Sequence, residues 1–386
     1  MACESTVKSE IEEGVAAAMK DVIEGLTRPL TSEEKSPKPQ TGKTPRVAFK
    51  GSLQEVNRFY YMKGWTDGLP IIPPTEEAVA EMMTGTDLPP DHVVATIIPR
   101  KGKATVEKIA VNAVMAGALP TYMPVLIATV QALADPKTRF DTFEVSTGSW
   151  APFLAINGRV RNDININCSS GALSPGNIAN AAIGRAVGLI VKNIGGARKA
   201  IEDMGVIGNP GKYSLVIGED EEASPWEPLS VERGYGKEDN TVTVFFPNTF
   251  IQTVPGGTDA QGILNTLSGM VSTTMSGIIL IPSWAKVLSN EGWTKQKIRE
   301  YLAEHIASGS SSATDLPSAK GPPTVDLNSS LMILVAGGPG SFIALLRSAG
   351  PGFFENALVT KKIELPKNWD RLVAKYRNIK PVYERY

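Results

Sequence analysis

Residues 167–196 constrain the fold of this chain most, because they predict a helix with two different faces. One face carries apolar side chains at helical spacing and should lie on a core: Ile183, Val187, Ile190, Val191 and Ile194. The opposite face carries only amides and very small residues: Asn177, Asn180, Ala181, Gly184 and Gly188. A solvated helix face normally carries lysine and glutamate. This face therefore predicts close approach by another stretch of backbone or by a ligand.

The composition is typical of a globular protein with a substantial core. The 386 residues are 42% hydrophobic and 20% charged, with a net charge of -1. A nearly neutral chain without basic runs disfavours binding to nucleic acid or to a membrane surface. No apolar run could cross a bilayer, and acidic residues stand where a signal peptide would be basic and then apolar. Two cysteines do not make a disulfide framework, so we expect a cytoplasmic protein.

Histidine is scarce, which limits the chemistry that one chain can perform. His92 and His305 are the two histidines of the sequence, so a histidine-rich zinc or iron site cannot be assembled within it. Acid–base chemistry would therefore fall to carboxylates, lysine, tyrosine or Cys168. The sequence assigns no metal ligands.

Residues 1–50 predict an N-terminal helical arm and linker. Ile11, Val15, Val22 and Leu26 can form one helical stripe, and residues 31–46 are rich in proline, lysine, threonine and serine. A short amphipathic helix is not stable alone in water. We expect the arm to dock on its own body or on a neighbouring subunit, and we favour a homo-oligomer formed through it.

Residues 51–386 predict an α/β or mixed α+β body, a layered sheet with helices, with two lobes that would divide near residues 235–260. The helices are expected over residues 52–63, 76 onward, 105–117, 125–134, 174–196, 262–275, 293–306 and 341–347. The strands are expected over residues 93–99, 143–145, 153–157, 213–217, 241–246, 278–281 and 331–336. The triplet Gly64-Trp65-Thr66 recurs at 292–294, which is too short a repeat to indicate a duplication.

Cys168 lies in a Ser/Gly loop before the predicted helix start at Ser174-Pro175. Near a helix N-terminus its thiol pKa would be lowered, which would make Cys168 a catalytic nucleophile. The alternative is a small buried residue in a tight loop. On the helix that follows, Asn177, Asn180 and Arg185 are candidates for substrate binding.

Residues 218–235 form an acidic loop that includes the run Glu219-Asp220-Glu221-Glu222. Trp226 stands between prolines, and a rigid aromatic side chain beside carboxylates can raise a carboxyl pKa and create a general acid or base. Glu222 and Glu227 are therefore catalytic candidates, and Trp226 is a candidate for binding the substrate. The alternatives are a solvated loop and a divalent cation held by oxygen ligands.

Two further candidates come from turns. Asp67 precedes Gly68 and could be catalytic, although aspartate in such turns usually caps local amides. Lys212 stands beside Tyr213 at a strand start, where it could bind substrate or simply be exposed.

Four motifs together resemble a largely uncharacterised bacterial family, described beside small thiol or selenol proteins with a U-G-S-C or C-G-S-C motif. The motifs are G-W-T-D-G-L-P-I-I-P-P-T-E-E (64–77), A-T-V-E-K-I-A-V-N-A-V-M-A-G (104–117), N-P-G-K-Y-S (209–214) and E-D-E-E-A-S-P-W-E-P-L (219–229). The resemblance covers most of residues 52–355. It implies an enzyme-like core, and it raises a thiol or selenol protein as a candidate partner. The chain has N-C-S-S-G at 167–171 and no C-G-S-C of its own.

These features together predict an enzyme, a lyase or hydrolase, that acts on a small polar, carboxylate-bearing substrate by carboxylate acid–base chemistry. Its pocket would be built from Asp67, residues 168–185 and residues 219–227. No cofactor is required, although a divalent cation on the acidic loop stays open. Two alternatives remain: a non-catalytic partner of a thiol- or selenol-dependent redox system, and a metal-dependent enzyme with oxygen ligands.

Overall fold

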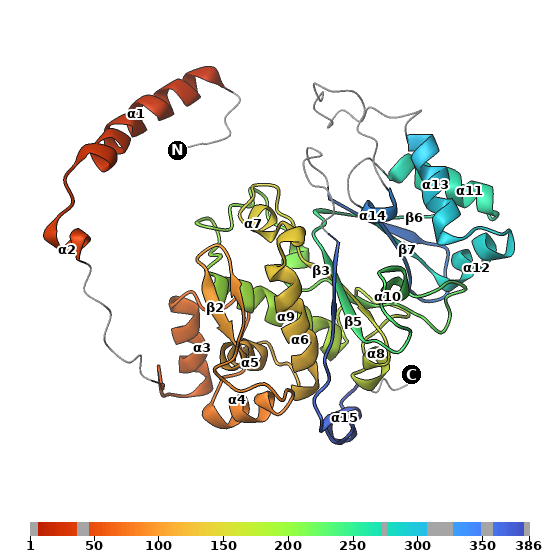
Figure 1. Cartoon of the computed structure of the whole chain (residues 1–386), viewed down its shortest axis with the longest axis horizontal. Coiled ribbons are helices and arrows are strands. Elements are labelled where there is room, and N and C mark those ends of the chain that lie inside the picture. Colours follow the sequence, from red (N-terminus) through yellow and green to blue (C-terminus); the bar gives the residue numbers. More distant parts are fainter. Residues whose placement is uncertain (1–6, 37–45, 272–275, 307–326, 349–357, 382–386) are drawn as a thin grey trace. The chain divides into compact units, whose positions relative to one another are not determined.

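The computed structural model describes residues 7–36, 46–271, 276–306, 327–348 and 358–381. The chain divides into two units, residues 1–50 and residues 51–386 (Figure 1). The first unit contains helices α1 (Lys8–Thr27) and α2 (Ser32–Lys35). No residue of α1 is buried, and the apolar stripe expected there is on its surface, with Val15 48% and Leu26 82% exposed.

The second unit is a mixed α/β body of layered sheets and helices, as the sequence predicted. Its helices are α3 (Leu53–Met62), α4 (Glu76–Met83), α5 (Val106–Met115), α6 (Met123–Ala134), α7 (Phe140–Phe143), α8 (Val160–Asp163), α9 (Ile178–Ile190), α10 (Leu229–Glu232), α11 (Ala260–Met270), α12 (Pro282–Asn290), α13 (Lys295–Ile306), α14 (Leu327–Ser330) and α15 (Trp369–Tyr376). Its strands are β1 (Val93–Ile97), β2 (Gly102–Thr105), β3 (Phe153–Asn157), β4 (Val216–Gly218), β5 (Thr241–Phe245), β6 (Thr249–Thr253), β7 (Ser276–Leu280), β8 (Leu331–Val335), β9 (Ile343–Arg347) and β10 (Val359–Lys362).

The two four-stranded sheets share the arrangement of three strands, β5-β3-β4 and β9-β7-β8, and differ in whether the fourth, edge strand comes last or first in the chain. Their strand orders are β10-β5-β3-β4 and β6-β9-β7-β8. In each sheet the last pair is parallel and the other neighbours are antiparallel. The chain passes from β5 directly into β6, the edge of the second sheet, and β10 later returns to the edge of the first. The second sheet is therefore built from four consecutive strands, whereas the first is completed by a strand from near the end of the described chain.

Two cores hold these layers together. The larger core combines α5, α6 and α9 with the first sheet and with one face of the second, including Met332, Leu334 and Leu346. The alternate residues of the second sheet, such as Ile333 and Leu345, form a second core with α11, α12 and α13. Alternation along each strand places successive side chains on opposite faces, so both faces of the second sheet are buried.

The carboxyl ends of the two parallel strand pairs meet. The amide of Asp220, just after β4, donates to the carbonyl of Val335 at the end of β8, at 2.7 Å. The amide of Gly337, just after β8, donates to the carbonyl of Cys168 at 2.8 Å. A Cβ at Gly338 would lie 1.7 Å from Ser170 Oγ, so the approach needs glycine. Ligand sites of α/β folds gather at such strand ends.

Three expected elements differ from the structure. Residues 140–143 form the short helix α7, where a strand was expected over 143–145. The run 341–347 was expected to be helical, but residues 343–347 form β9, between β6 and β7. Short apolar runs do not separate a buried strand from a helix by periodicity. Helix α9 begins at Ile178, later than the expected start at 174, and residues 272–275 of the expected helix over 262–275 lie outside the described residues.

Candidate functional site

The small-residue face of α9 packs against another segment of backbone. A Cβ at Gly184 would lie 2.7 Å from Ser214 Cα, and one at Gly188 would lie 3.0 Å from the carbonyl oxygen of Lys212. The segment that ends in β4 therefore occupies the space that the missing side chains leave. The sequence predicted that either another stretch of backbone or a ligand would approach the small-residue face of α9. In the structure, a stretch of backbone does so.

The two asparagines of this face stabilise the Cys168 loop. Asn180 is 4% exposed, and its Nδ2 donates to the carbonyls of Asn167, Ala172 and Val216. Its Oδ1 accepts from the amide of Asn167 at 2.8 Å. Because its hydrogen-bonding capacity is used within the protein, Asn180 has a structural role in place of the predicted substrate contact. Asn177 caps α9 by accepting from the Asn180 amide.

Asp67 and Arg185 bind each other. The guanidinium of Arg185 donates to both carboxylate oxygens of Asp67, at 2.7 and 3.0 Å, and to the carbonyl of Pro70 at 2.7 Å. Neither residue lines either of the pockets described below. The pair therefore fixes the turn at 66–70 on α9, and the structure does not bring Asp67 to the other catalytic candidates.

Lys212 is part of a buried charged cluster. Its Nζ lies 2.7 Å from Asp203 Oδ2 and 3.8 Å from Glu144 Oε1. Burial raises the pKa of Glu144 to about 7, with Lys212 opposing and Asp203 adding to the shift. Lys212 is thus neither simply exposed nor a lining residue of a described pocket.

Cys168 lines a shallow pocket of about 360 Å³ with Arg161, Asn177 and their neighbours. Burial, together with the charges of Asp220 and Glu222, raises the pKa of the Cys168 thiol, and Arg161 opposes this shift only in part. The expected lowering of this pKa is therefore wrong in direction. Helix α9 begins at Ile178, too far from Cys168 for its dipole to favour the thiolate.

Glu222 is held by Arg161, which lines the same pocket. The guanidinium of Arg161, 2% exposed, reaches Glu222 Oε1 at 3.0 Å and Glu221 Oε1 at 3.1 Å. Hydrogen bonds from Arg161, and from Asn162 to a lesser degree, lower the pKa of Glu222 to about 2. A carboxylate with so low a pKa is a weak base at neutral pH. Of the two predicted acid–base residues, Glu222 is therefore the weaker candidate.

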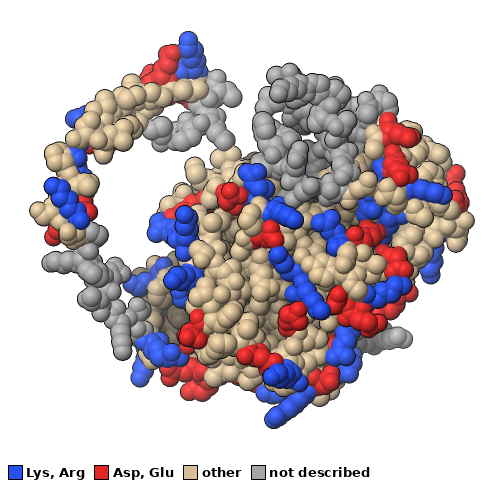
Figure 2. All heavy atoms as spheres, viewed as in Figure 1, with Lys and Arg blue, Asp and Glu red and all other residues tan. Residues whose placement is uncertain are grey.

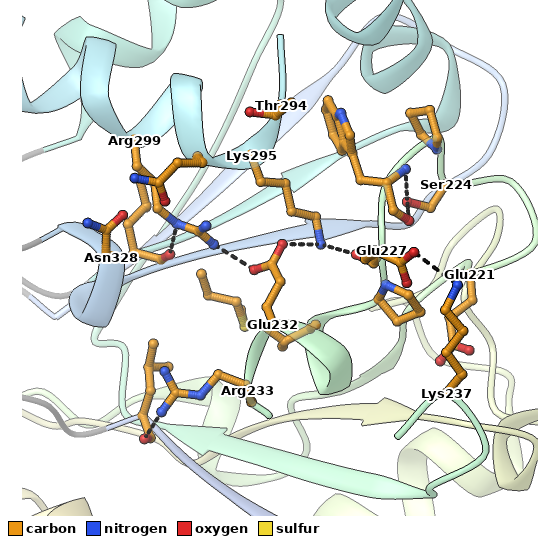
Figure 3. Close-up of a pocket in the computed structure, with 18 residues that line it drawn as sticks. Glu221, Ser224, Glu227, Glu232, Arg233, Lys237, Thr294, Lys295, Arg299 and Asn328 are labelled. Atoms are coloured by element: carbon orange, nitrogen blue, oxygen red, sulfur yellow. Dashed lines mark hydrogen bonds and ion pairs between the residues drawn. The ribbon is translucent and has the colours of Figure 1, made fainter. Parts of the chain in front are cut away.

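A larger pocket, of about 900 Å³, lies between the α10 segment, α13 and β8 (Figure 3). Its back wall is a buried chain of charges. Lys295, 4% exposed, lies 3.0 Å from Glu232 and 3.4 Å from the fully buried Glu219, and Arg299 lies 2.8 Å from the other oxygen of Glu232. Burial raises the pKa of Glu219, while Lys295, the Leu229 amide and Asn157 oppose the shift. Such pairs keep their geometry because separating them would leave a buried charge.

Glu227 is the carboxylate of this pocket that stays outside the buried network. Its side chain is 53% exposed, and Lys237, itself 68% exposed, lies 2.9 Å from its Oε1. The neighbouring Trp226 is fixed by a hydrogen bond from its Nε1 to the carbonyl of Trp293 at 3.0 Å. An ion pair between exposed side chains opens at little cost, so the Glu227 carboxylate is free to meet a ligand.

Arg161, Lys295 and Arg299 were not predicted from the sequence, and Glu219 and Glu232 were placed in the acidic loop without a role of their own. Lys295 and Arg299 stand four residues apart on α13, and this spacing places both on one helix face. That pattern could have marked a basic helix face, but its carboxylate partners come from a distant part of the chain.

The acidic loop binds the protein's own cations. Glu219, Glu221, Glu222 and Glu227 each lie within 4 Å of a lysine or arginine nitrogen. Among the residues that the structure describes, no group of three or more His, Cys, Asp or Glu side chains is placed to hold a metal ion. Figure 2 shows basic and acidic side chains interspersed over the visible face of the body.

Comparison of the chain with protein-family models, with curated proteins and with solved structures found no match. Within its described part, no helix has the length and apolar character needed to span a membrane.

Proposed function

We propose that the protein is an enzyme of the lyase or hydrolase class that acts on a small organic substrate in the 900 Å³ pocket, with Glu227 as the group that transfers protons. The main support for the proposal is that the Glu227 carboxylate is exposed and is not held by a buried partner. Glu219, Glu221 and Glu232 are held by buried cations or amides, whereas the side chain of Glu227, among the described residues, pairs with an exposed lysine alone.

The roles of the other pocket residues follow from their contacts. The network of Glu219, Lys295 and Glu232 forms a rigid wall, because each member is buried or paired on more than one side. Lys295 also donates to the carbonyl of Glu227 at 2.9 Å, which fixes the backbone from which the catalytic carboxylate projects. Trp226 supplies an apolar surface beside it. A rigid support of this kind keeps a general acid or base in the geometry that proton transfer needs.

The experiment is a screen for proton transfer. Hydroxy acids, keto acids and esters are incubated with the purified protein in D₂O, and ¹H NMR follows loss of C–H signals and appearance of products. We expect at least one compound to react, with Glu227→Gln slowing it strongly and Glu238→Gln, at an exposed neighbouring glutamate, acting as wild type. Equal rates for the wild type and Glu227→Gln would contradict the proposal.

The alternative role, as a partner of a thiol- or selenol-dependent system, would use Cys168. Its thiol does line an open surface pocket, which favours access by a partner. However, burial and two nearby carboxylates raise its pKa, which disfavours rapid thiol exchange. The larger pocket therefore supports the enzymatic role better.

We further propose that α1 forms a homo-oligomer with other copies of the chain. The support is its apolar stripe, whose members Ile11, Val15 and Val22 are 45–51% exposed, in a helix of which no residue is buried. We expect Val15→Asp combined with Val22→Asp to lower the mass measured by light scattering. The same mass for the wild type and the double variant would contradict this role.

A further inference from the structure

We infer that the substrate of this pocket is an organic carboxylate with an apolar body, and that Arg233 binds its carboxylate. The inference deepens the proposed function, and it rests on the large pocket being the substrate site. The basic side chains that line this pocket differ in whether a glutamate carboxylate lies close to them.

The basic side chains differ in their partners. Lys237, Lys295 and Arg299 each lie within 4 Å of a glutamate carboxylate. The guanidinium of Arg233 has no carboxylate that close among the described residues. A terminal nitrogen of Arg233 donates a hydrogen bond to the carbonyl of Leu358, at 2.9 Å.

The charge of Arg233 is also only partly exposed to water. Its side chain is half-buried at the end of α10, and burial together with the charge of Arg299 lowers the pKa of Arg233, with Glu232 and Tyr235 opposing. A guanidinium stays protonated in proteins, so this positive charge persists in a partly desolvated position. Such a charge is stabilised by a directly bound anion, and within the described residues no carboxylate lies within 4 Å of it.

The geometry selects a planar anion. Leu358 uses one terminal nitrogen of Arg233, which leaves donors for two parallel hydrogen bonds to a carboxylate. Figure 3 places Arg233 across the pocket from Lys295, with Glu232 between them.

The apolar residues that line the pocket indicate what the rest of the ligand is. Apolar side chains of Leu331, Met332 and Leu358 line the same pocket as Arg233, and Trp226 lines it beside Glu227. A ligand that extends from Arg233 would therefore place an apolar or aromatic body against these walls. A pocket of about 900 Å³ is large enough for such a molecule.

The test compares benzoate with benzamide, which has the same ring and shape but no charge, by isothermal titration calorimetry on the full chain. We expect the wild type to bind benzoate more tightly than benzamide by about ten- to one-hundredfold, because charged hydrogen bonds contribute that much. Arg233→Gln should remove this preference. Arg371→Gln, at an exposed arginine of α15, should keep it, and circular dichroism verifies that each variant is folded.

Arg233→Lys separates charge from geometry. It keeps the positive charge but loses the planar pair of donors, so its preference for benzoate should fall between those of the wild type and Arg233→Gln. Equal binding of benzoate and benzamide, absence of benzoate binding, or an unchanged preference in Arg233→Gln would overturn the inference. Inorganic phosphate that competes as well as benzoate would overturn the assignment to a carboxylate.

The two proposals fail separately. Glu227→Gln should slow turnover while benzoate affinity stays within about twofold, since Glu227 does not contact the carboxylate in this scheme. If benzoate binding depends on Arg233 but turnover does not depend on Glu227, only the catalytic proposal fails. If turnover depends on Glu227 but benzoate binding ignores Arg233, only the present inference fails.

Discussion

Glu144 should make the stability of the protein depend on pH near neutrality. Its carboxyl is buried next to the Lys212–Asp203 ion pair, and burial raises its pKa from the ordinary 4.5 to about 7. A carboxyl whose pKa is raised by folding is favoured in its protonated form. Its contribution is therefore fully present below pH 4.5 and is lost as the pH rises through 7.

The magnitude follows from the size of the shift. Each pKa unit corresponds to about 1.4 kcal/mol, so the full loss is about 3 kcal/mol, and most of it falls between pH 5 and pH 8. Glu144→Gln removes the ionisable group but leaves the pair of Lys212 and Asp203 in place. The free energy of unfolding of the wild type, relative to Glu144→Gln, should therefore fall by about 2–3 kcal/mol over this range.

Urea denaturation followed by tryptophan fluorescence, at half-unit steps from pH 5 to pH 8, measures this difference. The other titrating groups are common to both proteins, so their contributions largely cancel in the comparison. A difference that stays constant within about 0.5 kcal/mol over the range, or that changes in the opposite direction, would refute the reasoning.

Two further predictions concern the surroundings of Cys168 and α9. Because Glu222 helps to raise the pKa of Cys168, Glu222→Gln should speed iodoacetamide labelling of Cys168 by about two- to tenfold at pH 7.5, measured by mass spectrometry of the peptide, with Glu238→Gln as the control. An unchanged rate would show that the carboxylate does not control the thiol. Gly184→Ala should destabilise the protein by about 1–3 kcal/mol in urea denaturation, because the added methyl group would collide with Ser214. Wild-type stability in this variant would show that the helix and the 212–214 segment are not in close contact.

The local pattern of apolar and small residues in the sequence was sufficient to predict most of the layered fold. The apolar stripe and the small face of α9 lie where the sequence placed them, because both follow from helical periodicity alone. The strand arrangement that the two sheets have in common could not be predicted from the sequence. It depends on β5 and β9 pairing with strands that do not directly precede them in the chain, β3 and β7, and the echo of Gly64-Trp65-Thr66 at 292–294 lies at positions that the topology does not relate.

The candidate site was predictable only in part. Trp226 and Glu227 of the acidic loop line the large pocket, but the structure does not combine them there with Asp67 and residues 168–185 in the way that the sequence predicted. The sequence could not predict which carboxylate of the loop stays outside the buried ion pairs, because the paired cations lie far away in the chain. Arg161 holds Glu222, while Lys295 binds Glu219 and Glu232. The same limit applies to Cys168, whose pKa depends on the burial and neighbours that the tertiary fold creates.

The most direct test of the central claim compares the two pockets in one assay. For the first compound that reacts in the NMR screen, kcat/KM is measured for the wild type, Glu227→Gln and Cys168→Ala. The account predicts that Glu227→Gln loses about 10²–10⁴-fold, the usual contribution of a general acid or base, while Cys168→Ala stays within about twofold of the wild type. Loss of activity in Cys168→Ala with full activity in Glu227→Gln would contradict the account and would place the chemistry at the Cys168 pocket.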